Sequence, residues 1–558
     1  MTAPGRKDEL VFLPLGGVGE IGMNLGLYGY GPPRNRTWLA VDFGVAFAGP
    51  DLPGVDLIYP DIAYLEEERA SLTGIVLTHA HEDHFGAVID LWPRLRVPVY
   101  ATAFTAGLLN AKLASEPGAA AVPVTIVEPG QRFQLGPFEI EYVHVAHSIP
   151  ESHSLAIRTP LGLVLHSGDW KIDETPMDGP PTDAKRLREI GEEGVLALVC
   201  DSTNALRDGR SPSESEVARE LAELVKSAKG RVAFTTFASN VGRLRSIALA
   251  AAEAGRSVVV VGRAMRRVID VATELHYLDD CPPFLEEEAY AYLPRENVVA
   301  LLTGSQGEPR AALARVAADD HRNVELAPGD TVVFSSRAIP GNEKPINGII
   351  NALVGRGIHV VTDRDRLVHV SGHPRRGELR EMYSWLKPKI LVPVHGEAMH
   401  LAAQADFARE MGIETVRTIE NGEMLRLAPG PVEPIDEIEA GRIYKDGSLI
   451  GDLDAVGVAD RRKLSFAGHV AVSIVLDPKG NVLADPDIEL VGLPRADGGG
   501  RPLEDGVMSA VLGTLDSLPR PQKRDPEVVR EAVRRAVRAA VRDAWGKKPV
   551  CTVFVAVV

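Results

Sequence analysis

The chain has 558 residues, of which 45% are hydrophobic and 25% charged, as in globular proteins, and this length predicts roughly three or four folding units. The formal net charge of −16 excludes a nucleic-acid-binding coat over the whole surface, although a local basic groove remains open. The sequence has no apolar run near the ~20 residues of a membrane span and no N-terminal signal region. Its three cysteines include no C-x-x-C pair. We therefore expect a cytoplasmic protein without membrane contact or disulfide framework.

Residues 11–170 contain many short runs rich in Val, Ile, Leu and aromatic residues, bounded by Gly, Pro or Asp. This pattern is typical of β-strands. Two helices are expected among them, at 87–95 and 103–115, and a further strand ends at Asp201. We interpret residues 1–205 as the first part of one domain.

The pattern changes at about residue 206 to alternating helices and strands. The first helix is expected within 211–230, where Ser213 and Glu216 have the spacing of a capping box. Strands and helices then alternate up to about residue 340, which predicts a parallel sheet between helices. We interpret 206–355 as a domain inserted into the first.

Strands of the first kind return after residue 356, at 357–363, 366–373 and 389–397, so 356–432 is expected to complete the first domain. Residues 433–449 are predicted to be a linker. The C-terminal domain, 450–558, is expected to hold a strand, a Gly-rich turn, a long arginine-rich helix at 525–546 and a final strand. The arginines fit either a solvated helix face or a contact with RNA or a protein partner.

The strongest chemical signal is THAHEDHFGA, which places His79, His81, Asp83 and His84 within six positions. Alternate residues of a strand share a face, so a strand that enters a turn can direct two imidazoles to one point. The following Asp and His can then reach a second point nearby. This geometry suits two metal ions in one pocket, and imidazole with carboxylate favours Zn²⁺, with Mn²⁺ as an alternative.

Further ligands are expected at the ends of other strands. His147, Asp169 and His395 each follow an apolar run, and together they complete a set of seven ligands. His144 and His166 lie inside apolar runs and are expected to be core histidines.

The chain resembles proteins of the metallo-β-lactamase fold in three motifs: H-x-H-x-D-H, a later single His and an S-G-D carboxylate. That fold is an αββα sandwich with a dinuclear site along one sheet edge. The resemblance implies that His79, His81 and His147 bind one metal, that Asp83 and His84 bind the other, and that Asp169 bridges them. Asp201, the VHVSGH string with His369 and His373, and the PVHGE string with His395 resemble motifs A, B and C of the β-CASP nucleases. In that group the motif C histidine completes the shell of the second metal.

Several strings resemble one β-CASP branch, the bacterial ribonucleases J: LPLGGVGEIGMN, THAHEDHFGA, DSTN, FASN, TGSQGEP, VHVSGHP and LVPVHGE. The similarity is dense over residues 10–430. It implies an inserted β-CASP α/β domain and a small C-terminal α/β domain. It also implies 5′-to-3′ exonuclease activity on single-stranded RNA with 5′-monophosphate ends, endonuclease activity, and a place in mRNA decay and rRNA maturation. A homodimer or homotetramer formed through the C-terminal domain and partners in an RNA-decay complex are further expectations.

The same resemblance gives roles to individual residues. Asp83 is expected to orient or deprotonate the attacking water, His373 to stabilise the phosphate or protonate the leaving oxygen, and Asp201 to orient a histidine. Three stretches rich in small residues and hydroxyls are expected to bind phosphate: Phe237, Ala238, Ser239 and Asn240; Ser305 and Gln306; and His369, Val370, Ser371, Gly372 and His373. Five arginines are candidates for a cationic track: Arg243, Arg245, Arg263, Arg266 and Arg267.

Other functions are less consistent with the sequence. Gly17-x-Gly19-x-x-Gly22, with Asp42 beyond it, has the spacing of a dinucleotide-binding fingerprint, but a strand rather than a helix is predicted to follow, so we expect a tight loop beside Asn24 at the mouth of the metal site. A hydrolase of small esters or thioesters needs neither the inserted domain nor the motif around His373. An RNA-binding protein that has lost its metals would not keep all seven ligands. DNA remains an alternative substrate.

Overall fold

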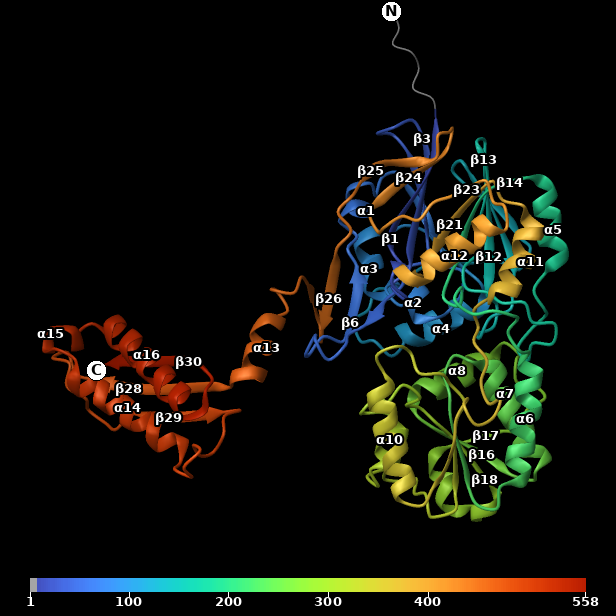
Figure 1. Cartoon of the computed structure of the whole chain (residues 1–558). Coiled ribbons are helices and arrows are strands. Elements are labelled where there is room, and N and C mark those ends of the chain that lie inside the picture. The colour runs from blue at the N-terminus through green and yellow to red at the C-terminus, as the bar shows by residue number, and fades with distance from the viewer. Residues whose placement is uncertain (1–7) are drawn as a thin grey trace, which may run out of the picture. The chain divides into compact units, whose positions relative to one another are not determined.

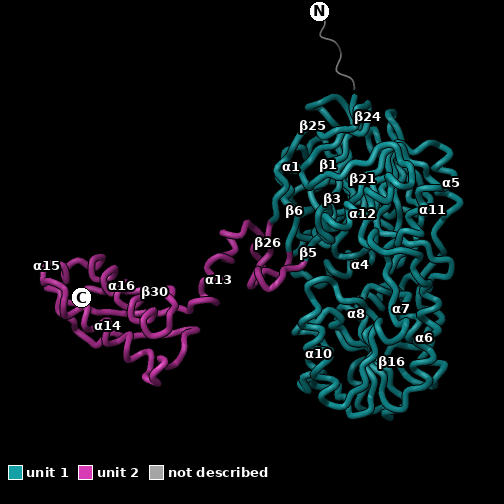
Figure 2. The backbone as a smooth tube through the Cα atoms, in the orientation of Figure 1, with its two compact units in different colours: residues 1–46, 58–442 teal, residues 47–57, 443–558 magenta. Residues whose placement is uncertain are grey.

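The computed structural model describes residues 8–558; positions 1–7, part of the segment in which no signal is expected, lie outside the described residues. The described chain forms two compact units, one of residues 8–46 and 58–442 and the other of residues 47–57 and 443–558 (Figure 2). Each is described separately below.

Two mixed sheets face each other in the first unit (Figure 1). The first has the order β25-β24-β1-β3-β4-β7-β8-β9. Its strands are β1 (Glu9–Gly16), β3 (Leu25–Gly31), β4 (Thr37–Val41), β7 (Leu72–Val76), β8 (Val99–Ala101), β9 (Val124–Ile126), β24 (Glu423–Ala428) and β25 (Glu433–Glu437). The second has the order β10-β11-β12-β13-β14-β21-β23. Its strands are β10 (Arg132–Leu135), β11 (Phe138–His144), β12 (His153–Thr159), β13 (Gly162–His166), β14 (Val195–Asp201), β21 (Ile390–Val394) and β23 (Thr415–Val416).

The core between these sheets consists of alternate strand residues such as Phe12, Tyr28, Tyr142 and Val164, which are almost fully buried. A second core lies under helices α5 (Ala184–Glu193), α11 (Arg376–Leu386) and α12 (Ala398–Glu410). The other helices of this part are α1 (Ala63–Glu67), α2 (Glu82–Phe85), α3 (Val88–Leu95) and α4 (Ala103–Leu113). The expected αββα sandwich is therefore present.

The inserted segment forms a parallel sheet with the order β17-β16-β18-β15-β19-β20. Its strands are β15 (Val232–Thr235), β16 (Ser257–Val261), β17 (Phe284–Leu285), β18 (Val298–Leu302), β19 (Thr331–Phe334) and β20 (His359–Val361). Its helices are α6 (Glu214–Ser227), α7 (Val241–Glu253), α8 (Arg263–Glu274), α9 (Ala312–Ala317) and α10 (Glu343–Gly355). The capping box of Ser213 and Glu216 is present at the start of α6.

The strand expected at 366–373 was wrong, because this segment forms no strand. Its polar backbone atoms bond to side chains instead of to a neighbouring strand: the Val368 carbonyl accepts hydrogen bonds from Arg243 and Ser335, and the Gly372 carbonyl is bonded to His147. The segment at 433–449, expected to be a linker, holds β25 together with β26 (Arg442–Asp446).

The second unit contains a sheet with the order β29-β28-β30, covered on one face by two helices. Its elements are β27 (Leu449–Gly451), α13 (Val458–Ala467), β28 (His469–Leu476), β29 (Asp487–Val491), α14 (Leu503–Ser517), α15 (Arg520–Lys523), α16 (Pro526–Trp545) and β30 (Val550–Val557). Strand β29 and helices α13, α14 and α15 were not expected from the sequence. Every fourth residue of α16 from Val529 to Val541 is a valine that faces the core. Of the arginines on this helix, Arg535 and Arg542 are exposed, and the others are half-buried.

Candidate metal centre

All seven predicted ligands lie where strands end along one edge of the sandwich. His79 and His81 follow β7, and Asp83 and His84 belong to the short helix α2. The other three follow strands of the second sheet: His147 after β11, Asp169 after β13 and His395 after β21. The sheet edge thus gathers side chains that are up to 316 positions apart, from His79 to His395.

One end of the pocket is formed by His79, His81, His147 and Asp169. The Nδ1 atom of His81 lies 3.1 Å from Nε2 of His79 and 3.1 Å from Nε2 of His147. Asp169 Oδ2 lies 3.8 Å and 3.5 Å from the same two Nε2 atoms. Tetrahedral Zn²⁺ with bonds near 2.1 Å separates its ligand atoms by about 3.4 Å, so these four atoms fit one zinc ion.

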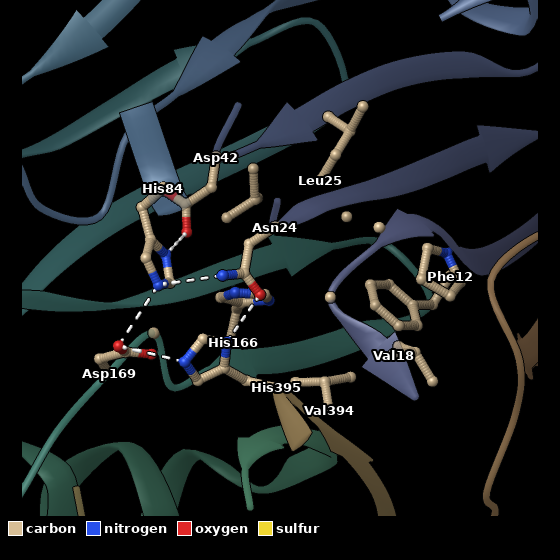
Figure 3. Close-up of a pocket in the computed structure, with 16 residues that line it drawn as sticks. Phe12, Val18, Asn24, Leu25, Asp42, His84, His166, Asp169, Val394 and His395 are labelled. Carbon is tan, nitrogen blue, oxygen red and sulfur yellow. Dashed lines mark hydrogen bonds and ion pairs between the residues drawn. The ribbon is translucent and has the colours of Figure 1, made fainter. Parts of the chain in front are cut away.

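The other end is formed by Asp83, His84, His395 and again Asp169. Figure 3 shows the last three of these side chains. Asp169 Oδ2 lies 3.3 Å from Nε2 of His84 and 3.4 Å from Nε2 of His395. Asp83 Oδ2 lies 3.8 Å from each of these Nε2 atoms. Because Asp169 Oδ2 belongs to both sets, it has the position of a bridging ligand.

Two buried atoms of this cluster test whether a cation fits. Asp169 Oδ1 and His395 Nε2 are shielded from solvent and have no hydrogen-bond partner among the described residues. Burying such atoms is costly unless another group satisfies them. A metal ion at the second end would satisfy His395 Nε2, and cations at the two ends would offset the buried negative charge of Asp169, so the donor set fits a dinuclear centre.

Burial favours the neutral form of three of the ligand histidines, the form that binds a metal ion. Burial lowers the pKa of His79 and His147 well below the ordinary value, and it lowers that of His81 to about 4. Burial acts in the same direction on His84, but the carboxylates of Asp169, Asp83 and Asp42 outweigh it and raise the pKa of His84 well above its usual range. That second end of the pocket therefore favours positive charge.

Four ligand rings are oriented by hydrogen bonds on the nitrogen that faces away from the pocket. Nδ1 of His84 donates to Asp42 Oδ2 at 2.7 Å, and Nδ1 of His395 donates to Asn24 Oδ1 at 2.9 Å (Figure 3). Nδ1 of His147 donates to the Gly372 carbonyl at 2.7 Å. Nδ1 of His79 lies 3.0 Å from the hydroxyl of Thr78, which in turn donates to Asp42. Such contacts fix ring orientation and tautomer, and they raise the basicity of the ligand.

Asn24, Asp42 and Thr78 were not assigned these contacts by the sequence analysis. Asp42 was considered only as the acidic residue of a dinucleotide fingerprint, although its place at the end of β4, beside β7 with the HxH motif, was a usable signal. The glycine-rich stretch passes close to Asn24 and His395: a Cβ at Gly17 would lie 2.3 Å from Asn24 Oδ1, and the Gly17 carbonyl accepts a hydrogen bond from His395 N. Gly17 and Gly19 have positive φ values of 86° and 78°. No helix follows these glycines, as predicted, because β3 begins at Leu25.

Asp201 and His373 lie beside the metal ligands. Nδ1 of His373 is 2.8 Å from Asp201 Oδ2 and 3.8 Å from Asp169 Oδ2. Burial would lower the pKa of His373, but the carboxylates of Asp201 and Asp169 raise it to about 9. These two carboxylates therefore favour the protonated form of the His373 imidazole.

Four family models match successive segments of the chain. Residues 38–179 match the "Beta-lactamase superfamily domain", 229–353 the "Ribonuclease J, beta-CASP domain", 357–417 the "Zn-dependent metallo-hydrolase RNA specificity domain", and 456–558 the "Ribonuclease J C-terminal domain". Ribonuclease J of Sinorhizobium meliloti is 60% identical over 553 residues, which is 99% of this chain and 98% of that protein. The chain belongs to the ribonuclease J family.

Other relatives are more distant. Ribonuclease J of Thermus thermophilus is 36% identical over 98% of this chain and 95% of its own length. A crystal structure of a protein of unknown function from Enterococcus faecalis shares the fold, with a TM-score of 0.53 and 16% identity over 75% of this chain and 100% of that one. As a ribonuclease J, the chain is a metal-dependent ribonuclease, a zinc-dependent metallo-hydrolase of phosphodiester bonds that binds RNA.

The three segments expected to bind phosphate, 237–240, 305–306 and 369–373, are brought together only in part. The rings of Phe237 and His369 lie 6.5 Å apart, and Ser371 accepts a hydrogen bond from Asn204. Asn240 caps α7 through the backbone N–H of Arg243. Gln306 is buried and bonds to backbone atoms of Arg337 and Ile339. The remaining members are buried or half-buried: Ala238, Ser239, Ser305, Val370 and Gly372.

One arginine of the expected cationic track was assigned wrongly. Arg243 is fully buried, where its guanidinium forms an ion pair with Glu214 and bonds to Ser335 and Val368. Arg245 and Arg266 are half-buried and paired with Asp280 and Glu286, so they have less charge to offer a ligand.

No helix in the described part of the chain is long and apolar enough to cross a membrane.

Proposed function

We propose that this ribonuclease J removes nucleotides from single-stranded RNA in the 5′-to-3′ direction, prefers 5′-monophosphate ends, and also cleaves internally. We further propose two Zn²⁺ per subunit, with Mn²⁺ as an alternative, held by the seven ligands. The observation that supports this most strongly is Asp169 Oδ2, which lies within 3.8 Å of ligand nitrogens on both sides.

The two metal ions would supply Lewis-acid chemistry, activating water and neutralising charge on the phosphate. The protein groups supply the rest. Asp83, whose side chain is 27% exposed, is the ligand carboxylate most accessible to a water molecule and would accept its proton. His373, protonated and held by Asp201, would stabilise the growing charge on the phosphate or donate a proton to the leaving 3′ oxygen.

Water would add to phosphorus as the bond from phosphorus to the 3′ oxygen breaks. The released nucleotide keeps a 3′ hydroxyl, and the remaining strand begins with a new 5′ phosphate. Each cycle therefore regenerates the preferred end. The stretches 237–240, 305–306 and 369–373 are proposed to hold that terminal phosphate and its nucleotide.

The wider setting is also proposed. Residues 1–205 with 356–432, 206–355 and 450–558 would be the functional domains, with 433–449 between the first and the last. The enzyme would act in the cytoplasm, in mRNA decay and rRNA maturation, as a homodimer or homotetramer formed through the C-terminal domain and with partners of an RNA-decay complex.

The substrate class can be tested on three oligonucleotides of one sequence: 5′-monophosphorylated single-stranded RNA, 5′-triphosphorylated RNA and single-stranded DNA. We expect mononucleotide release from the first, little from the second and none from the third. Equal cleavage of DNA, or hydrolysis of a small thioester with no release from RNA, would contradict the proposal.

A further inference from the structure

Three arginines that the expected cationic track did not include come together near the metal centre. Arg207 follows the segment that begins at Asp201, Arg375 lies two residues after His373, and Arg337 follows β19 of the inserted domain. We refer to Arg207, Arg337 and Arg375 as the arginine cluster.

Hydrogen bonds hold the segments of Arg207 and Arg375 side by side. The Asn204 side chain donates to Ser371 Oγ at 2.9 Å and to the His373 carbonyl at 3.1 Å. The backbone N–H of Arg376 donates to the Arg207 carbonyl at 2.9 Å, and its Nε donates to the Ala205 carbonyl at 2.9 Å. The bond from Asn204 to the His373 carbonyl also holds the segment of Arg207 next to His373.

The third arginine is held near the candidate phosphate-binding stretches. The Arg337 carbonyl accepts a hydrogen bond from the Gln306 side chain at 3.0 Å. Two residues earlier, Ser335 donates to the Val368 carbonyl at 2.7 Å, which ties the end of β19 to the segment that leads to His373. The segment that carries Arg337 is therefore tied to the segment that leads to His373 and Arg375.

The positive charge of this cluster is poorly compensated within the protein. Among the described residues, the Arg207 side chain forms no ion pair or hydrogen bond, and Arg375 Nε is buried without a partner. Asp363 lies 3.5 Å from Arg337 Nε, and Arg375 Nη1 donates to the Arg210 carbonyl at 3.3 Å. Burial and repulsion from Arg337 and Arg375 lower the pKa of Arg207.

We propose that the arginine cluster binds a backbone phosphate of the RNA strand close to the scissile bond. The guanidinium groups offer planar pairs of donors that match phosphate oxygens. Asp363 is the carboxylate that offsets part of the cluster's charge, and the remaining positive charge would attract a polyanion in a chain of net charge −16. This inference rests on the proposed function and adds a site separate from the stretches proposed to hold the 5′ phosphate.

The test compares wild type with Arg207→Gln and with Arg207→Gln/Arg375→Gln, using 5′-monophosphorylated single-stranded RNA at a series of NaCl concentrations. We expect KM to rise about 10-fold or more in the double variant, as hydrogen bonds to a charged group are lost, with kcat within two-fold. The slope of log(kcat/KM) against log[NaCl] should become shallower by about 0.7 for each phosphate no longer neutralised.

Arg356→Gln is the matched control. Arg356 is half-buried like Arg207, but its guanidinium is already paired with Asp319, so its loss should change neither KM nor the salt slope. Wild type that fails to cleave RNA would refute the proposed function itself. Normal wild-type cleavage, with cluster variants that keep the wild-type KM and salt slope or lose only kcat, would refute the cluster alone.

Discussion

Asp201 Oδ2 and His373 Nδ1 lie 2.8 Å apart although the two residues are 172 positions apart in the sequence. Asp201 is fully buried at the end of β14, and its backbone carbonyl accepts a hydrogen bond from Gln404. The pair is thus anchored on the sandwich side, and its imidazole faces the metal centre from the loop that follows the inserted domain.

Replacing Asp201 with Asn should leave the shape of this pair but remove its charge. Because Asp201 is a main reason that the pKa of His373 is raised to about 9, the pKa should fall in the variant. If His373 acts while protonated, kcat falls by about 10²-fold at neutral pH, and the alkaline limb of the kcat profile moves to lower pH. A pH–rate profile with metal analysis checks this; loss of bound metal, or an unmoved limb, would show that Asp201 has another role.

The glycine-rich loop allows a closely matched pair of variants. A Cβ at Gly17 would lie 2.3 Å from Asn24 Oδ1, the acceptor for His395, whereas a Cβ at Gly19 would meet no atom within 4 Å. Both positions have positive φ, so both Ala variants have a similar backbone strain of about 1–3 kcal/mol. We expect Gly17→Ala to lose affinity at the second metal position and Gly19→Ala to keep it. Competition with a chelator measures both, and equal affinities would contradict this role for Asn24.

Asp42→Asn tests the contact behind His84. The carboxylate accepts bonds from His84 Nδ1 and from both the backbone N–H and the hydroxyl of Thr78, and an amide nitrogen cannot accept these bonds. We expect metal affinity to fall by about 10–100-fold, with the sandwich still folded by circular dichroism. Unchanged affinity would mean that the ligand rings need no such anchoring.

The buried pair of Glu214 and Arg243 should stabilise the inserted domain against the loop of His373. Both side chains are at most 4% exposed, so Glu214→Gln leaves an uncompensated buried charge and should cost about 3–5 kcal/mol. Arg245→Gln breaks a partly exposed pair and should cost about 1 kcal/mol or less. Thermal unfolding monitored by fluorescence compares the two variants, and similar losses would be inconsistent with this account.

The sequence was informative where chemistry and periodicity coincide. His79, His81, Asp83 and His84 stand together in one motif, and the Val-rich strands around them could be located, so the sandwich and its ligand set were predictable. Asp169 and His395 could be found because each ends an apolar run.

Contacts set by tertiary packing were not predictable. An arginine such as Arg243 is expected at the surface when only the sequence is considered. It is buried because Glu214 in a neighbouring helix pairs with it and the Val368 carbonyl accepts a hydrogen bond from it. The segment at 366–373 was predicted to be a strand because of its apolar residues. Its backbone carbonyls instead form hydrogen bonds with side chains. The arginine cluster was missed because its three members are far apart in sequence.

The number of metal ions bound by the folded, active chain tests the central claim most directly. Elemental analysis after removal of free metal should give about two Zn²⁺ or Mn²⁺ per chain for wild type. It should give about one for Asp83→Ala/His84→Ala, which keeps His79, His81, His147 and Asp169, and this variant should no longer cleave RNA. A single metal ion in fully active wild type, or retained cleavage in the double variant, would contradict a two-metal centre bridged by Asp169.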